Sequence, residues 1–267
     1  PPRSTLFPYT TLFRSYSRND TSLYACYFKR DYRAVARQFE CLTAGRAPAP
    51  NAKRGMRNTS NGGTLRIFRL ACAATGEYTA FHGGTAALGQ AAIVTAINRV
   101  TGIYETELSI RLILVANNIS VVYTNAGTDP YSNSSSGTIV GENQANLDSV
   151  IGSANYDIGH VFSTGSGGYA PGLVCNACTK AWGTTGQAIP IGDPFYVDYV
   201  VHEIGHQFNA NHCFNGSGGN FGSAQWGPSA YEPGSGSTLL SYAGSCGIDN
   251  LQSNIDPCFH FVSPYEI

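Results

Sequence analysis

The segment that most constrains the fold is His202–His212 (HEIGHQFNANH), which carries three of the six histidines of the chain. In an α-helix, His202 and His206 lie on one face about 6 Å apart along the axis, so both imidazoles can reach one ion. If the helix continued, His212 would lie about 9 Å beyond His206, far outside a metal–nitrogen bond of about 2.1 Å. The chain must therefore turn sharply between them, and Asn209 is the residue best suited to a left-handed turn conformation.

This spacing predicts a catalytic zinc site with His202, His206 and His212 as ligands, because three histidines leave the fourth position of a tetrahedral zinc ion open to water. Glu203 lies about 100° around the helix from His202 and can reach that water. The zinc ion lowers the pKa of the water towards about 7, and Glu203 takes its proton as general base during attack on a peptide carbonyl. The alternative is a buried helix whose histidines hydrogen-bond internally.

Charge is distributed unevenly along the chain. Residues 1–62 carry 11 Lys and Arg against 3 Asp and Glu, a net charge of +8, whereas residues 63–267 carry 5 against 14, a net charge of −9. An acidic body argues against nucleic-acid binding, because the phosphate backbone needs a positive surface. No apolar run reaches 18 residues, so we expect no membrane span. We expect a monomer that acts on a protein or peptide substrate.

Composition divides the chain into three parts. Residues 1–15 repeat Thr-Leu-Phe without a clear amphipathic period and are interpreted as a non-native flank. Residues 16–63 are basic and end in a Pro-, Gly- and Arg-rich stretch, which is typical of a pro-segment or linker. Residues 64–267 show the regular patterning of a folded domain.

The basic segment is expected to mask the acidic cleft until it is cleaved near Arg54 or Arg57. Cys26 or Cys41 could cap the zinc ion as a thiolate, since thiolates are good zinc ligands. A disulfide between these two cysteines is the alternative.

Six of the eight cysteines lie in the acidic body, at positions 72, 175, 178, 213, 246 and 258. An even number predicts a disulfide framework in an oxidising, extracellular compartment, with the pairing left open. Cys175-x-x-Cys178 has no second CxxC partner, so disulfides are favoured over a structural zinc site.

Hydrophobic periodicity predicts the order of the secondary-structure elements. Strands are expected at 65–74, 108–116, 119–124 and 156–163, helices at 85–101, 142–151 and 193–209, and an irregular loop at 214–237. This order favours an α/β (α+β) fold in which a twisted mixed sheet packs against helices.

The histidine segment resembles the zinc signature HExxHxxGxxH of metzincin metallopeptidases. More narrowly, residues 64–267 are similar to the reprolysin-like (M12B-type) catalytic domains of secreted bacterial proteins. The matching stretches are GEYTAF at 76–81, NYDIGHVFSTG at 155–165 and YEPGSGST at 231–238. The resemblance implies a secreted zinc endopeptidase with a five-stranded sheet, an active-site helix, a loop-rich C-terminal subdomain and a cleft across the zinc ion.

Two positions depart from the family pattern. The family's glycine is Asn209 here, and the methionine of its Met-turn is Leu240, since the only methionine of the chain is Met56. The family residue forms an apolar floor under the ligands, and a Leu-for-Met exchange typically costs under about 1.5 kcal/mol. Tyr242 stands two residues later, where some metzincins have a tyrosine that binds zinc and then stabilises the transition state. Simple packing of this tyrosine is the alternative.

A substrate peptide is expected to pair with an edge strand at 157–164, in which His160 has a structural role. Three alternatives remain open, one of which is a damaged fragment that does not fold. A gluzincin-type peptidase would use Glu232 as its third ligand, and a catalytically silent zinc-binding or adhesion module would have the same fold. The presence of Glu203 argues against the silent module, because zinc binding alone does not need that carboxylate.

Overall fold

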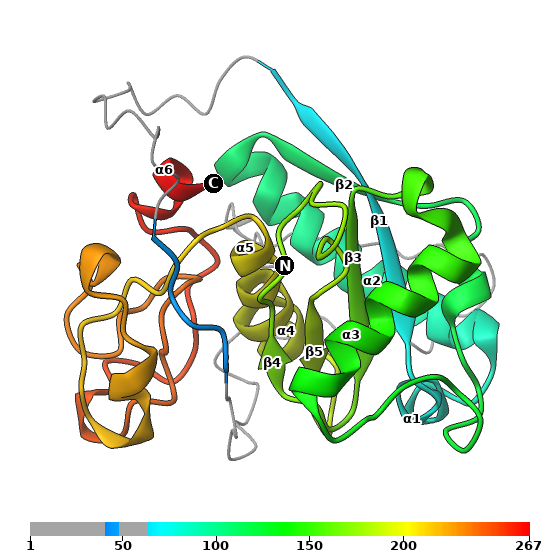
Figure 1. The fold of residues 1–267 in the computed structure, drawn as a ribbon. Coiled ribbons are helices and arrows are strands. Elements are labelled where there is room, and N and C mark those ends of the chain that lie inside the picture. Colours follow the sequence, from blue (N-terminus) through cyan, green and yellow to red (C-terminus); the bar gives the residue numbers. More distant parts are fainter. Residues whose placement is uncertain (1–40, 48–63) are drawn as a thin grey trace, which may run out of the picture. The chain divides into compact units, whose positions relative to one another are not determined.

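The computed structural model describes residues 41–47 and 64–267 (Figure 1). The predicted flank at 1–15, Cys26, Arg54 and Arg57 lie outside the described residues. Within the described part, a five-stranded sheet has the order β2-β1-β3-β5-β4. The strands β1 (Arg66–Ala74), β2 (Ile110–Leu114), β3 (Ile158–Ser163) and β5 (Thr184–Gly186) run parallel, and β4 (Gly168–Tyr169) runs antiparallel at one edge.

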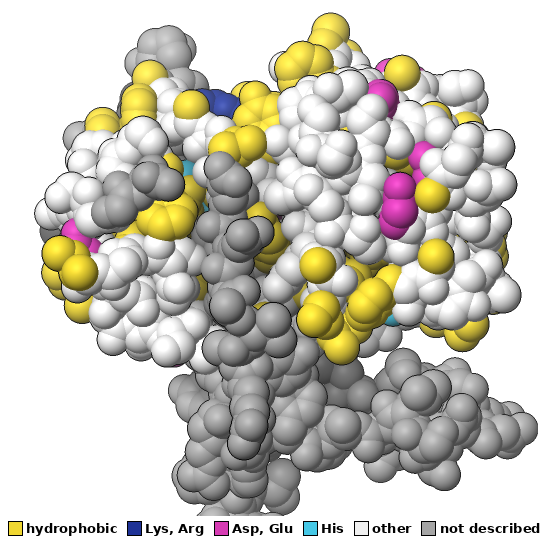
Figure 2. Space-filling model, turned by 90° about the horizontal axis from the view of Figure 1, so that it is seen from below, with side chains coloured by type: hydrophobic (Ala, Val, Ile, Leu, Met, Phe, Trp, Pro, Cys, Tyr) yellow, Lys and Arg dark blue, Asp and Glu magenta, His cyan; other side chains and the backbone are white. Residues whose placement is uncertain are grey.

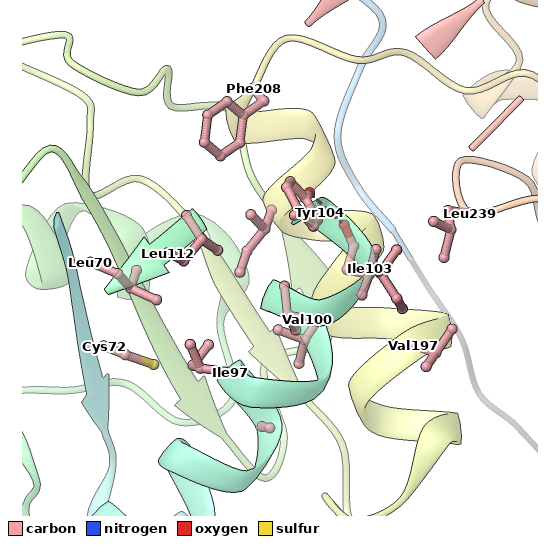
Figure 3. Packing of buried hydrophobic residues seen from close by; sticks show 14 of the residues in the cluster. Leu70, Cys72, Ile97, Val100, Ile103, Tyr104, Leu112, Val197, Phe208 and Leu239 are labelled. Atoms are coloured by element: carbon pink, nitrogen blue, oxygen red, sulfur yellow. Dashed lines mark hydrogen bonds between the residues drawn. The ribbon is translucent and has the colours of Figure 1, made fainter. Parts of the chain in front are cut away.

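Helices cover both faces of the sheet. The α-helices of the described part are α1 (Gly76–Phe81), α2 (Ala86–Leu108), α3 (Ser136–Leu147), α4 (Asp193–Phe195), α5 (His202–Gln207) and α6 (Ser263–Glu266). Alternate side chains of β1 point to opposite faces, as the period of a strand requires. Leu70 and Cys72 pack in the cluster that contains α2 and α5, whereas Ala71 and Ala73 pack in the cluster that contains α3. Figure 3 shows α2 and its buried residues packed against the sheet.

The helix predicted at 85–101 is confirmed as α2, which runs on to Leu108. The Thr85 hydroxyl caps the helix by accepting a hydrogen bond from the Leu88 amide, and Ser109 ends it in the left-handed conformation with a φ of 54°. Tyr104 is fully buried, and its hydroxyl donates to the Val201 carbonyl at 3.1 Å. This bond fixes α2 to the segment that leads into α5.

The helix predicted at 193–209 is confirmed as one continuous helical stretch with three parts. α4 passes into a π-helical segment at Tyr196–Val201, and α5 follows at once. Val200, Val201 and Ile204 are fully buried in the main core. Burial on this scale holds α5, and with it the first two histidines, firmly against the sheet.

The strands predicted at 65–74, 108–116 and 156–163 are confirmed as β1, β2 and β3. The expectation that 157–164 is an edge strand is wrong, because β3 pairs with β1 on one side and β5 on the other. The edge near α5 is β4, which is too short to show a period of its own.

The prediction of a strand at 119–124 is wrong. Asn118–Val121 forms a 3-10 helix, and only an isolated bridge joins Val122 to Ala74. The Asn118 side chain accepts from the Cys72 amide at 2.7 Å and donates to the Cys72 carbonyl at 2.9 Å. A side chain thus satisfies backbone groups of β1, while Val121 and Val122 are buried without strand pairing.

The helix predicted at 142–151 is confirmed as α3, which begins earlier and continues into a π-helical segment at Asp148–Gly152. The irregular loop predicted at 214–237 is also confirmed, with two short 3-10 helices at Gly219–Ala224 and Gly227–Ser229. No helix in the described ranges is long and apolar enough to cross a membrane. The face drawn in Figure 2 shows Asp and Glu side chains at several places and few Lys or Arg side chains.

The expected disulfide framework is wrong for the described part of the chain, where Cys41, Cys72, Cys175, Cys178, Cys213 and Cys246 are free thiols. The buried thiols lie in different surroundings: Cys72 is in the main core, Cys246 is in a small cluster beside Tyr242, and Cys213 donates to Glu232 at 2.8 Å. Cys175 and Cys178 are exposed. An even number of cysteines was therefore a poor guide to pairing.

Candidate metal centre

The chain break predicted at Asn209 is present and gathers the three histidines. α5 carries His202 and His206, and Asn209 then adopts the left-handed conformation with a φ of 76°. The turn brings the Nε2 atom of His212 to 3.1 Å from that of His202 and 3.0 Å from that of His206. The Nε2 atoms of His202 and His206 are 3.1 Å apart.

Backbone carbonyls fix which ring nitrogen of each histidine carries the proton. The Nδ1 atoms of His202, His206 and His212 lie 2.8, 2.7 and 2.7 Å from the carbonyl oxygens of Leu239, Ala210 and Ala224 respectively. A carbonyl oxygen only accepts, so each Nδ1 must donate and each Nε2 must present a lone pair. Three lone pairs that converge at about 3 Å repel one another, and a shared cation removes that repulsion.

Burial keeps the three rings neutral. It lowers the pKa of His212 to about 4 and the pKa values of His202 and His206 well below their usual range. Neutral imidazoles with fixed Nδ1 partners are the form that ligates transition metals. The three side chains therefore fit a metal ion.

A fourth possible ligand is Cys41, one of the two cysteines proposed from the sequence as a cap. Its sulfur lies 3.5 Å from Nε2 of His206, and the four ligand atoms all lie within 4.8 Å of one another. Burial, together with the nearby Glu203 carboxylate, raises the pKa of the Cys41 thiol well above its usual value. A bound cation would reverse that effect and favour the thiolate.

Segment 41–47 (blue in Figure 1) extends from Cys41 along the edge strand. The Leu42 amide donates to the Gly168 carbonyl at 2.9 Å, and Cys41 and Gly168 form an isolated parallel bridge. The Thr43 hydroxyl accepts from the Ala170 amide at 2.8 Å. A segment that the sequence analysis assigns to the pro-segment or linker thus occupies the cleft beside the histidines.

Glu203, the residue proposed from the sequence as general base, is fully buried beside the histidines. The Thr43 hydroxyl donates to its Oε2 at 3.4 Å, while its Oε1 has no hydrogen-bond partner among the described residues. Burial raises the pKa of Glu203 to about 8, against the opposing effect of hydrogen bonds from Cys41 and Thr43. A Cβ atom on Gly168 would lie 2.0 Å from this Oε1, so the glycine makes room for the carboxylate.

The turn after the histidines lies under the metal centre. Leu240 is fully buried, and its Cδ atoms would lie 3.1 and 3.5 Å from a Cβ atom on Gly205 of α5, which fits an apolar floor. The Tyr242 ring stacks on Phe214 with 4.5 Å between centroids and lies 4.8 Å from the His212 ring. Its hydroxyl donates to the Cys41 carbonyl at 3.0 Å. Tyr242 is therefore at the site, and its catalytic role stays a prediction.

Glu232 is not a ligand in this structure. Its carboxylate accepts from the Thr238 hydroxyl at 2.6 Å and from the Ser237 amide at 3.0 Å, and it also bonds Cys213. The alternative of a glutamate as third ligand is therefore wrong, since His212 takes that position.

Sequence reasoning missed Gln207, which supports the active-site helix. Its side-chain nitrogen donates to the Gly159 carbonyl at 2.8 Å, and its oxygen accepts from Nδ1 of His160 at 2.8 Å. The Thr185 hydroxyl lies 2.9 Å from the other ring nitrogen of His160. His160 is thus a structural residue, as predicted. A polar residue directly after the second histidine and directly before the apolar Phe208 was the available signal.

These features define the metal-binding site of a metallopeptidase. The family model described as metallo-peptidase family M12B, reprolysin-like, matches residues 64–262, a range that contains all three histidines. The chain belongs to this family. Its mixed five-stranded sheet, active-site helix and loop-rich C-terminal part agree with the fold class that the sequence predicts.

Three solved structures are similar to this chain. A chaperone–substrate complex has a TM-score of 0.43 and 13% identity, over 75% of this chain and 34% of that chain. Metalloproteinase-II from Bacteroides fragilis has a TM-score of 0.44 and 14% identity, over 79% of this chain and 54% of that chain. Myroilysin has a TM-score of 0.42 and 11% identity, over 90% of this chain and 94% of that chain. No curated protein sequence matches the chain.

We predict that His160 makes stability depend on pH. Burial lowers its pKa from 6.5 to about 4, so between these values the unfolded chain binds a proton that the folded chain does not. Stability from this residue is therefore full above pH 6.5 and falls as pH falls, by about 1.4 kcal/mol per pH unit. Glutamine does not titrate. The loss of unfolding free energy caused by His160→Gln, measured by urea unfolding, should be about 2 kcal/mol smaller at pH 5.0 than at pH 7.5. A cost that is equal at both pH values would contradict it.

Proposed function

We propose that this chain is a zinc-dependent endopeptidase that hydrolyses protein substrates. The observation that carries the proposal is the convergence of three imidazole lone pairs beside a buried glutamate whose Oε1 has no partner in the described part of the chain. Imidazole ligands and a tetrahedral arrangement suit zinc. The resemblance of residues 64–267 to secreted domains supports secretion, and finding the native protein only inside its cells would contradict this.

The metal ion, Glu203 and Tyr242 would have separate roles in the proposed reaction. A zinc ion, when bound, supplies Lewis-acid activation of water and of the peptide carbonyl. Glu203 would accept a proton from the attacking water and pass it to the leaving amine. Tyr242, whose hydroxyl donates to the Cys41 carbonyl, would donate to a substrate carbonyl in the same place as charge develops there.

The edge strand β4 is the surface on which a substrate peptide would lie. Backbone groups at an exposed edge can pair with an extended peptide, whichever side chains that peptide carries. Segment 41–47 already uses this edge, since it bonds Gly168 and Ala170. The substrate is therefore assigned to β4 in place of the strand at 157–164.

We further propose that segment 41–47 holds the enzyme latent. Cys41 occupies the fourth ligand position, and Thr43 donates to Glu203, so the segment blocks both the metal and the base. A tethered blocker acts at high effective concentration, so even modest contacts keep the cleft closed. Activation would then require removal or displacement of the segment.

Replacing Glu203 with Gln should abolish peptidase activity and leave zinc binding intact, because the carboxylate moves protons while the imidazoles hold the metal. We expect a loss of about 10²–10⁴-fold in casein hydrolysis by the Cys41→Ala chain, in which the proposed block is relieved, measured with and without a chelator. Zinc content by mass spectrometry should stay near that of the unaltered chain. Glu107→Gln, in α2, is the matched control. A Glu203→Gln chain that cleaves casein at close to the original rate would exclude Glu203 as the base.

Replacing Cys41 with Ala in the full chain should raise the rate of peptide hydrolysis by tenfold or more. A tenfold increase corresponds to the loss of about 1.4 kcal/mol from the contacts that hold the segment in the cleft. Cys178→Ser, which changes an exposed thiol, should leave the rate unchanged. Both chains are compared after zinc loading and at equal zinc content. If the unaltered chain is as active as the Cys41→Ala chain, Cys41 does not impose latency.

Tyr242→Phe should lower kcat by about 10²–10³-fold with little change in KM, because a hydrogen bond that strengthens in the transition state acts on kcat. The test uses the Cys41→Ala chain, in which the thiol no longer competes for the centre. Phenylalanine keeps the ring that stacks on Phe214, and Tyr231→Phe, at an exposed tyrosine, is the control. A kcat above about a third of the reference, a difference under 1 kcal/mol, would leave Tyr242 only a packing role.

A further inference from the structure

The far end of segment 41–47 is bound by contacts that neither the metal nor the general base explains. The Arg46 guanidinium donates from its two terminal nitrogens to the carbonyl oxygens of Ala170 and Gly172, at 3.0 and 3.2 Å. These carbonyls belong to the chain that leaves β4. Two acceptors at this spacing match the fork of a guanidinium, which presents its donors in fixed directions.

Asn211 holds the main chain of the same residue. The Arg46 amide donates to Oδ1 of Asn211 at 2.6 Å, and Nδ2 of Asn211 donates to the Arg46 carbonyl at 3.3 Å. Glu266 of α6 orients Asn211 by accepting from its amide at 2.7 Å and from Nδ2 at 3.0 Å. Glu266 and the buried Asn211 are both parts of the folded domain. The orientation of the Asn211 side chain therefore does not depend on the presence of the segment.

The neighbouring position is also shaped by the domain. A Cβ atom on Gly45 would lie 2.3 Å from ring atoms of Trp226, so the peptide passes beneath this indole only where it has no side chain. The surroundings favour a cation, since residues 63–267 carry a net charge of −9 and Lys180 is the only basic residue after Arg111. Ionic hydrogen bonds to carbonyl oxygens are about twice as strong as neutral ones.

We propose that the Ala170 and Gly172 carbonyls and the Asn211 side chain form a subsite of the cleft that binds an arginine, or less well a lysine, of the substrate. The segment occupies this subsite in the latent chain, and a substrate would take it after the segment leaves. Cys41 lies at the histidines and Arg46 follows five positions later, so the basic residue is expected within about five residues of the cleaved bond. The role in substrate selection rests on the proposed peptidase function.

Binding of peptide copies tests the subsite without requiring catalysis. The zinc-loaded full chain carries Cys41→Ala and Arg46→Ala to vacate the cleft and Glu203→Gln to prevent turnover. Fluorescent copies of residues 41–47, with Ser in place of Cys41, carry Arg, Lys or citrulline at the position of Arg46. Citrulline keeps the shape of arginine and lacks its charge.

The arginine copy should bind about tenfold or more tightly than the citrulline copy, with lysine between them. A copy with Val at the position of Gly45 should bind at least tenfold more weakly. A chain that keeps its own Arg46 should bind the arginine copy several-fold less well, because its subsite is filled. Equal affinities of the arginine and citrulline copies, or no binding of any copy at about 1 mM, would overturn the proposal.

Cleavage of unrelated peptides separates the subsite from the peptidase function. The chain with Cys41→Ala and Arg46→Ala, and with Glu203 intact, should cleave peptides that carry arginine at one fixed distance from the cut bond about tenfold faster than their citrulline analogues. Cleavage with no such preference at any position would overturn the subsite and leave the proposed function standing. Tighter binding of the arginine copy with no cleavage of any peptide would overturn the proposed function and leave a basic-residue binding site.

Discussion

The mutual repulsion of three imidazole lone pairs is the constraint on which the rest of this structure depends. Each Nδ1 is tied to a backbone carbonyl, so the three Nε2 atoms must face one another at 3.0–3.1 Å. A shared cation relieves the repulsion between these lone pairs, and the arrangement forms only if the chain reverses after α5. Asn209 makes the reversal by adopting a φ of 76°, a conformation that asparagine tolerates better than most residues.

Contacts elsewhere in the fold fix the position of α5 and therefore of the histidines. Gln207 ties α5 to the sheet through Gly159 and His160, and Tyr104 ties the preceding π-helical segment to α2. Leu240 packs beneath the helix in place of the methionine that the family has at this position. Since every one of these contacts is buried, the ligands approach a metal ion already oriented, which is the condition for efficient chemistry at such a site.

The centre itself could be predicted from sequence because its geometry is local: histidine spacing, the helix and a left-handed residue lie within His202–His212. The long elements β1 and α2, and the continuous helical stretch at 193–207, carry enough periodic residues to be recognised. The short edge strand β4 could not be predicted, because two residues hold no period. The strand expected at 119–124 failed because Asn118 satisfies the backbone of β1 with a side chain. The position of Cys41 depends on contacts across more than a hundred residues, which spacing cannot reveal.

Under the proposed latency, the contact of Cys41 with the histidines would link the metal centre to its regulation, because one residue would both complete the ligand set and close the cleft. X-ray absorption at the zinc edge, on the full chain after zinc loading, examines this set directly. The structure predicts three nitrogen scatterers at about 2.0–2.1 Å with the signature of imidazole and one sulfur at about 2.3 Å. A shell with fewer than three imidazoles, or with nitrogen and oxygen alone and no sulfur, would contradict the centre described here.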